Sequence, residues 1–344
     1  MTRALALLTM LLLIAPSLAP ADEHRLQDAT GRSVTIPQSI ERIFAAGPPA
    51  SLFVFAVAPE KLLGWTRKPH REETALLPQD YARLPGVGRL TGRGGSANLE
   101  RVMALEPDLI IDVGSTAPTY RDLASRMQEQ SGIPMLLFDG RIDATPATLR
   151  SLGALTGHPG RGEALANWAE EEIEAIRSGV EAIPRDKRPR VYYARGPAGL
   201  ETALSGAINV EVLDLLGVTN VAGEALGRGG LASVSMEEIL AWDPEVIVTV
   251  DEEFARNLHA APLWQQVKAV RQGRVYLAPR NPFPWIDYPP GPNRLIGLSW
   301  LAGRLYPDHF PQDIGDKVKD FYQHFYHREP SAQEVRALLR SPAD

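Results

Sequence analysis

Short apolar runs alternate with segments of helical periodicity along most of this chain. Glycine, proline or charged residues bound the apolar runs, as is typical of strands buried inside a sheet. These runs lie at 31–37, 41–47, 61–65, 109–114, 134–139, 188–196, 246–250 and 273–279. Helical patterns lie between them, at 50–58, 99–105, 120–130, 209–217, 236–242, 262–270 and 293–306. The alternation predicts an α/β fold whose mostly parallel sheets are covered by helices.

One phrase of the sequence occurs twice. The tetrapeptide Gly-Arg-Gly-Gly at 92–95 precedes "NLERVMALEPDLIIDV", and the same tetrapeptide at 227–230 precedes "SMEEILAWDPEVIVTV". In both copies apolar residues at helical spacing lead into an acid-proline-acid junction and then into an apolar strand. Any helix–strand unit shares part of this pattern. The common junction nevertheless favours a duplicated architecture of two αβα lobes.

A long helix is predicted between the two halves. Residues 162–183 have helical periodicity, charged outer positions and no internal proline, which gives a helix of ~30 Å. A single connecting helix permits small rocking of the lobes rather than wide closure. We therefore divide the chain into a leader (1–21), a first lobe (22–143), a linker with the long helix (144–184) and a second lobe (185–344), with a ligand cleft between the lobes.

The first residues predict export from the cytoplasm. Arg3 precedes the apolar run "ALALLTMLLLIA", and Ala19-Pro20-Ala21 provides a small-x-small cleavage signal, as in a secretory signal peptide. A membrane anchor is the alternative, but the run is shorter than the ~20 apolar residues that a spanning helix needs. Because the chain has no cysteine to carry a lipid, we expect a free periplasmic protein that begins near Asp22.

Composition narrows the class of function further. The lack of cysteine excludes disulfides, thiolate catalysis and Cys-ligated zinc. The net charge of −6, or −7 once Arg3 is removed, comes with no basic cluster and argues against a nucleic-acid partner. The common nucleotide-binding, zinc-protease and hydrolase motifs are missing, and the seven histidines are scattered. We therefore assign no catalytic residue, no cofactor and no bare-metal site.

The candidate ligand site lies in the loops at the carboxyl ends of the strands, where open parallel sheets bind ligands. Arginines in these loops could hold negative groups, because a guanidinium is planar, permanently charged and can donate two hydrogen bonds to the same oxyanion. Aromatic residues in the proline-rich loop 280–293 could pack against an apolar ligand surface. The alternatives are solvated arginines and an ordinarily packed surface loop. The candidates are Gly47, Pro48, Ser51, Arg93, Arg195, Arg228, Trp285 and Tyr288.

The order of these motifs resembles that of one protein family. The leader, the segment "GRSVTIPQSIERIFAAGPPASLFVFAVAPEKLLGW", both copies of the repeated phrase and the long middle helix together resemble the Fe/B12-type periplasmic substrate-binding proteins of ABC importers. This family includes binders of ferric siderophores, cobalamin and haem, and a branch that binds molybdate or tungstate. The resemblance implies two lobes with a ligand between them and docking of the protein onto a permease dimer. It also implies a docking glutamate on each lobe, which falls on Glu211 in the second lobe but on Leu52 in the first, where Glu60 is a nearby candidate.

The function that we predict from these observations is solute capture without catalysis. We expect a monomer that binds an anionic iron complex, similar to a ferric siderophore, and delivers it to an ABC importer. The first alternative is a molybdate- or tungstate-binding protein of the same fold. A bare-metal binder and a secreted hydrolase are the remaining alternatives.

Overall fold

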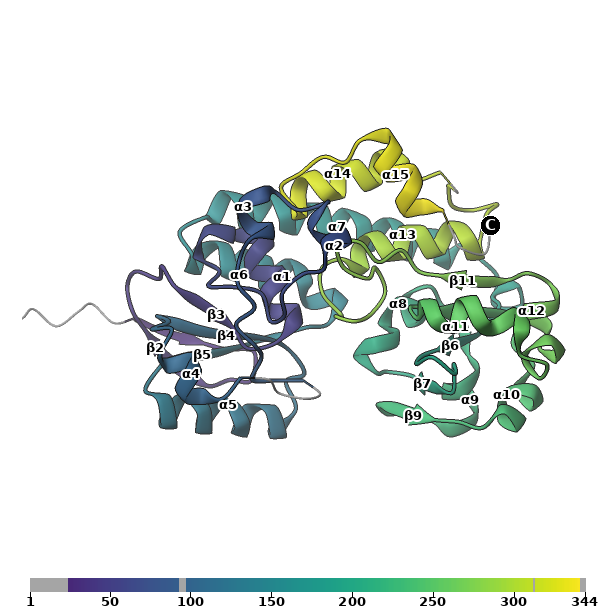
Figure 1. Ribbon diagram of the computed structural model, residues 1–344, viewed down its shortest axis with the longest axis horizontal. Coiled ribbons are helices and arrows are strands. Elements are labelled where there is room, and N and C mark those ends of the chain that lie inside the picture. Colours follow the sequence, from purple (N-terminus) through teal and green to yellow (C-terminus); the bar gives the residue numbers. More distant parts are fainter. Residues whose placement is uncertain (1–23, 93–96, 312, 341–344) are drawn as a thin grey trace, which may run out of the picture.

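A computed structural model of the protein describes residues 24–92, 97–311 and 313–340, and within them it contains two lobes, each built on a parallel sheet (Figure 1). The sheet of the first lobe has the strand order β3-β4-β5, and that of the second lobe has the order β11-β10-β6-β8. Two antiparallel pairs, β1-β2 and β7-β9, lie outside these sheets. The strands are β1 (His24–Gln27), β2 (Ser33–Ile36), β3 (Ile43–Ala45), β4 (Leu109–Gly114), β5 (Met135–Asp139), β6 (Arg190–Ala194), β7 (Glu201–Ala203), β8 (Thr219–Asn220), β9 (Leu231–Ser233), β10 (Val246–Thr249) and β11 (Val275–Leu277).

Helices surround both sheets, so the predicted fold class is confirmed. The α-helices are α1 (Pro48–Val57), α2 (Arg71–Thr74), α3 (Gln79–Ala82), α4 (Leu99–Met103), α5 (Pro118–Ser131), α6 (Thr145–Leu155), α7 (Pro159–Glu181), α8 (Glu211–Leu215), α9 (Val221–Leu226), α10 (Met236–Trp242), α11 (Glu252–Asn257), α12 (Lys268–Arg271), α13 (Arg294–Leu305), α14 (Gly315–Phe325) and α15 (Ala332–Leu339). Short 3₁₀ turns include η1 (Pro59–Lys61), η4 (Ile208–Val210) and η6 (Trp264–Gln266). The residue boundaries of the lobes stay a prediction.

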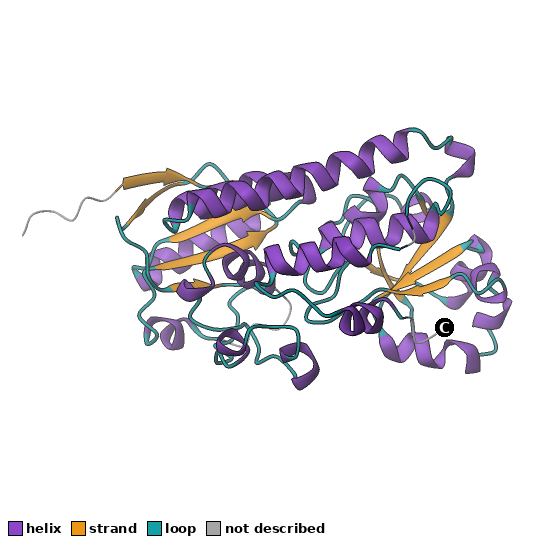
Figure 2. Ribbon diagram, turned by 90° about the horizontal axis from the view of Figure 1, so that it is seen from above, coloured by secondary structure: helices purple, strands orange, loops and turns teal. Residues whose placement is uncertain are grey.

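Helix α7 connects the two lobes as one uninterrupted helix. Its 23 residues correspond to a length of about 35 Å, and Figure 2 shows it running from one sheet to the other. Helix α6 packs closely against its start, because a Cβ atom on Gly153 would lie only 2.8 Å from the Cα atom of Gly162. Two facing glycines therefore let these helix backbones approach each other, and α6 packs against the first turn of α7.

The two copies of the repeated phrase form the same local structure. Helices α4 and α10 are each followed by a residue with positive φ, Glu106 at 47° and Asp243 at 41°, directly before the proline. The second acid of each junction accepts a hydrogen bond from the neighbouring strand segment, Asp108 from the Arg42 amide at 2.8 Å and Glu245 from the Arg190 amide at 3.2 Å. Each junction therefore ends a helix and aligns the following buried strand, β4 or β10, with its neighbour.

Two sequence-based predictions of elements are wrong. Residues 61–65 form no strand and contribute only isolated bridges, Leu62 to Ile43 and Trp65 to Gly86. Residues 262–270 do not form one helix, because extended backbone at Val267 separates η6 from α12. Both segments place apolar side chains such as Leu62, Trp65, Trp264 and Val267 in the core, and this packing does not require one continuous strand or helix.

Candidate functional site

The largest set of candidate ligand residues surrounds a cavity of about 580 Å³ between the two lobes. It lies at the carboxyl ends of β4 and β6, the place where parallel sheets commonly bind ligands. A volume of this size falls within the range of about 300–1,000 Å³ that is common for small-molecule pockets. The first lobe and its loops contribute, among others, Gly47, Pro48, Pro49, Ser51, Leu52, Trp65, Arg67, Arg89, Thr91, Asp112, Gly114, Ser115 and Tyr120. The second lobe and the 280–293 loop contribute Arg195, Ile208, Asn209, Leu231, Phe283, Asp287, Tyr288, Pro289 and Pro290.

The start of helix α1 forms part of the first-lobe wall. Gly47 precedes the helix and packs so tightly that a Cβ atom there would lie 2.7 Å from Oγ1 of Thr91 and 3.0 Å from Oδ1 of Asp112. Pro48 and Pro49 occupy the first helical positions, where they start a helix well but have no N–H group to donate. The hydroxyl of Ser51 donates to the Pro48 carbonyl at 2.7 Å. This helix start therefore offers an electropositive end but few hydrogen-bond donors to an anion.

Asp112 is a buried carboxyl group in the cavity wall, and the sequence analysis did not identify it. It lies near the end of strand β4, and its Oδ1 atom accepts hydrogen bonds from the Thr91 hydroxyl at 3.1 Å and from the Val113 amide at 3.0 Å. Burial in the wall raises the pKa of Asp112 to about 6. The signal in the sequence was a single acid inside the apolar run "LIIDVG", where a charged residue is unusual.

Two arginines of the first lobe also line the cavity and were not predicted. They are Arg67 and Arg89. Nη1 of Arg67 donates to Oε2 of Glu73 at 2.8 Å, and this bonding raises the pKa of the guanidinium. Arg67 lies two residues after the buried Trp65, just beyond the strand predicted at 61–65. The expected arginine of this lobe, Arg93, lies outside the described residues.

A buried ion pair forms the second-lobe wall. Arg195 follows strand β6, is 3% exposed, and its Nε atom lies 3.3 Å from Oδ2 of Asp287. Asp287 also accepts hydrogen bonds from the Tyr193 hydroxyl at 3.1 Å and from Nδ2 of Asn209 at 2.9 Å. The ring of Tyr288 covers the Arg195 guanidinium, with Cζ 4.5 Å from the ring centroid. Arg195 and Tyr288 thus lie together in the cavity, whereas Asp287 and Asn209 were not predicted.

Two predicted ligand residues do not line the cavity. Trp285 is fully buried in the core, where its indole N–H donates to the Tyr322 hydroxyl at 3.2 Å. Arg228 is exposed and is not among the lining residues, and its guanidinium lies over Gly206. Of the candidate arginines, Arg195 lines the cavity and Arg228 does not, and the rings that face the cavity from the 280–293 loop are Phe283 and Tyr288 rather than Trp285.

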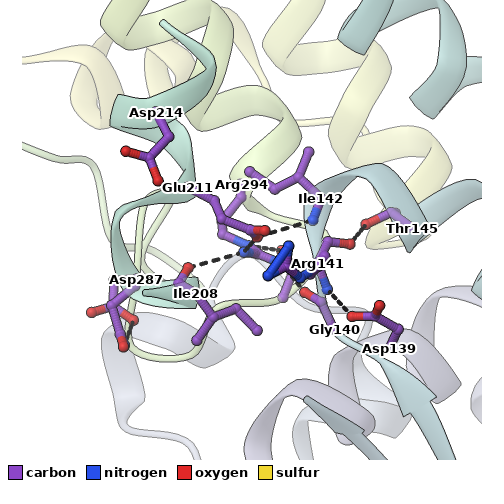
Figure 3. A network of polar contacts seen from close by, with 12 residues as sticks. Asp139, Gly140, Arg141, Ile142, Thr145, Ile208, Glu211, Asp214, Asp287 and Arg294 are labelled. Carbon is purple, nitrogen blue, oxygen red and sulfur yellow. Dashed lines mark hydrogen bonds and ion pairs between the residues drawn. The ribbon is translucent and has the colours of Figure 1, made fainter. Parts of the chain in front are cut away.

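Glu211 is mostly buried and is paired with Arg294, and its role in permease docking stays a prediction. Its Oε2 atom accepts from Nη1 of Arg294 at 2.8 Å and from the Ile142 amide at 3.1 Å (Figure 3). Leu52, at the corresponding first-lobe position, is buried. Glu60 is about half exposed and lies 3.3 Å from Nε2 of His158 at the start of α7.

Neither a metal site nor a membrane-spanning helix is found in the described parts of the chain. Across 24–92, 97–311 and 313–340, no three His, Asp or Glu side chains gather closely enough to hold a metal ion. In the same segments, no helix combines the length and the apolar character that crossing a bilayer requires.

Comparison with known proteins identifies the family. The family model for periplasmic binding proteins matches residues 65–282. The chain belongs to the periplasmic binding proteins. An ABC transporter solute binding protein from Sulfurospirillum deleyianum is 30% identical in sequence, with a TM-score of 0.82 over 91% of this chain and 98% of that one. The two-lobe fold is therefore that of an ABC substrate-binding protein.

Relatives of this binding protein differ in their named ligands. The molybdate-binding protein MolA of Haemophilus influenzae is 25% identical, over 93% of this chain and 96% of MolA. A cobalamin-binding protein of Halobacterium salinarum is 26% identical, over 72% of this chain and 64% of that protein. Members of the family are transport proteins that act outside the cytoplasm with ABC permeases. Their names do not fix one ligand class for the family.

Proposed function

We propose that this binding protein captures an anionic metal complex with an organic shell, of the ferric-chelate class, and delivers it to an ABC permease dimer. The observation that carries the proposal is the composition of the cavity: Arg67, Arg89 and Arg195 lie among Trp65, Phe283 and Tyr288 in a space of about 580 Å³. Guanidinium groups suit carboxylate or catecholate oxygens, and aromatic faces suit the apolar edges of a chelator. Asp112 and Asp287 offset part of the positive charge, so the wall favours a ligand of moderate negative charge.

A second candidate is a compact oxyanion, molybdate or tungstate. Similarity to MolA over nearly the full length of both proteins favours it. A tetrahedral oxyanion is best held by several converging N–H donors. Pro48 and Pro49 remove two such donors from the start of α1, so the arginines would have to supply most of the hydrogen bonds.

Thermal unfolding of the mature protein with a ligand panel tests this proposal. The panel contains ferric citrate, a ferric catecholate, haem, cobalamin, molybdate and tungstate. A ligand that binds the native state at 100 times its Kd stabilises it by about 2.7 kcal/mol, which for a chain of this size raises Tm by several degrees. A rise with the ferric complexes alone supports the proposal, and a rise with molybdate or tungstate alone makes the second candidate correct. A rise with cobalamin or haem alone would contradict both.

A further inference from the structure

The guanidinium of Arg195 has hydrogen-bonding capacity that the protein itself does not use. Its Nε and Nη1 atoms are buried and have no hydrogen-bond partner in the part of the chain that the structure describes. Burying a charged donor without such partners costs free energy. Because the same side chain lines the cavity, the unused donors indicate a ligand atom rather than a structural role.

Asp287 fixes the position of Arg195. Asp287 is 1% exposed, and its two oxygens accept hydrogen bonds from Tyr193, Asn209 and the Tyr288 amide, at 3.1, 2.9 and 2.8 Å. Its ion pair with Arg195 at 3.3 Å brings the charges together without a directed hydrogen bond. Asp287 thus neutralises the buried cation and leaves donors of the guanidinium uncommitted.

The Tyr288 ring covers the guanidinium that Asp287 fixes. The ring centroid lies 4.5 Å from Cζ of Arg195, while the tyrosine as a whole is 54% exposed and so is not held by core packing. Its backbone has a φ of 63°, and its amide donates to the same Asp287 carboxylate. One carboxylate therefore holds both the cation and the residue that covers it.

We propose that the Tyr288 ring is a displaceable cover on Arg195, and that an anionic oxygen of the ligand takes its place on the guanidinium. A contact between a cation and an aromatic face is weaker than charge-assisted N–H···O bonds, which an oxygen edge can make to two guanidinium nitrogens at once. The exchange thus favours ligands that present a carboxylate, catecholate or oxo edge. This inference rests on the proposed function, because it specifies how an anion is bound in the same cavity.

A Tyr288 ring that covers Arg195 and a Tyr288 ring that contacts the ligand predict opposite effects of removing the ring. Molybdate is too compact to need the ring as a packing surface. If the ring competes with the anion for Arg195, Tyr288→Ala should therefore bind molybdate about three- to tenfold more tightly than the wild type. If the ring packs against the ligand instead, the same substitution should weaken binding. Tyr288→Phe keeps the ring over the guanidinium and should not show this gain in affinity. Leu263→Ala, which truncates another exposed apolar side chain outside the cavity, is the matched control.

The experiment combines calorimetry with NMR of arginine side chains on the full mature protein. Titrations use molybdate and gallium(III) citrate, a diamagnetic analogue of ferric citrate, and the Arg195 Nε–Hε signal is assigned by its loss in Arg195→Lys. We expect Tyr288→Ala to remove the ring-current shift of that signal, and anion binding to the wild type to move the signal in the same direction.

The outcomes separate this inference from the proposed function. Binding of either anion to the wild type with an unmoved Arg195 signal, or equal or weaker molybdate binding by Tyr288→Ala, would overturn the cover and leave anion capture intact. Binding of molybdate to Tyr288→Ala but not to the wild type supports the cover. If neither protein binds either anion, the cover is overturned, and the proposed function is overturned as well if the ferric catecholate of the thermal-unfolding panel also leaves Tm unchanged.

Discussion

At the scale of single residues, Asp112 links the stability of the protein to pH. Burial raises its pKa from the usual 3.8 to about 6, so the folded state binds more protons than the unfolded state between these values. The free energy of unfolding should therefore fall as pH rises from about 4 to 6, by an amount of the order of 2–3 kcal/mol.

Asp112→Asn isolates this effect. The amide oxygen can still accept from Thr91 and Val113, while the buried charge is removed. We expect the variant to gain stability over the wild type at pH 8 and to gain little at pH 4, measured by urea unfolding at both pH values. An equal difference between the two proteins at pH 4 and pH 8 would contradict the buried-charge account.

Single residues of the site were only partly predictable from the sequence. The rule that ligands lie at strand carboxyl ends selected Gly47, Pro48, Ser51, Arg195 and Tyr288, which all line the cavity. It failed for Trp285, because sequence alone does not tell which aromatic residue of a loop turns into the core. It also missed Asp287 and Asn209, whose roles depend on contacts between segments far apart in the chain.

At the scale of elements, the start of α1 is packed so tightly that it should tolerate little increase in side-chain size. A Cβ atom on Gly47 would collide with Thr91 and Asp112 at 2.7 and 3.0 Å, so Gly47→Ala must push the helix start away from the cavity wall. We expect a loss of about 1–3 kcal/mol in stability and at least tenfold weaker ligand binding. Urea unfolding and calorimetry measure the two effects.

Gly160→Ala is the control for that substitution. Gly160 lies in the first turn of α7, and a Cβ atom there would meet nothing within 4 Å. Stability and affinity should both stay near the wild-type values or, for stability, improve slightly. If Gly47→Ala behaves like Gly160→Ala, the tight packing at the start of α1 does not matter for the site.

Elements with strong local signals were predictable, and those defined by packing were not. The long helix and both repeat units appear where periodicity and the acid-proline junctions put them, because helical spacing and proline geometry act within a few residues. Residues 61–65 and 262–270 carry apolar patterns without such local signals. Tertiary contacts decide their conformation, and they form bridges and short turns.

At the scale of the whole molecule, Arg294 at the start of α13 forms hydrogen bonds with residues of both lobes. It is 1% exposed, and its guanidinium donates to the Gly140 carbonyl of the first lobe, to the Ile208 carbonyl at 3.2 Å and to Glu211 at 2.8 Å (Figure 3). Glu211 in turn accepts from the Ile142 amide. The network lies beside the cavity, to which Ile208 also contributes.

Removing Arg294 should therefore destabilise the protein as a whole. Arg294→Met leaves Glu211 buried without its cation and the carbonyls without their donor, so we expect a loss of about 3–5 kcal/mol. Glu211→Gln, which keeps the shape of the side chain, should cost less. Urea unfolding measures both, and a loss below about 1 kcal/mol for Arg294→Met would show that the lobes are held together by other contacts.

The central claim is that an anionic metal complex binds between the lobes, against the arginines of the cavity. Cocrystals of the mature protein with the ferric complex that raises Tm most, measured at the iron absorption edge, test it directly. We predict a single strong anomalous peak within the cavity, with ligand oxygens on Arg195 and on Arg67 or Arg89. An iron peak outside this cavity, or a bound complex without contact to any of these arginines, would contradict the account.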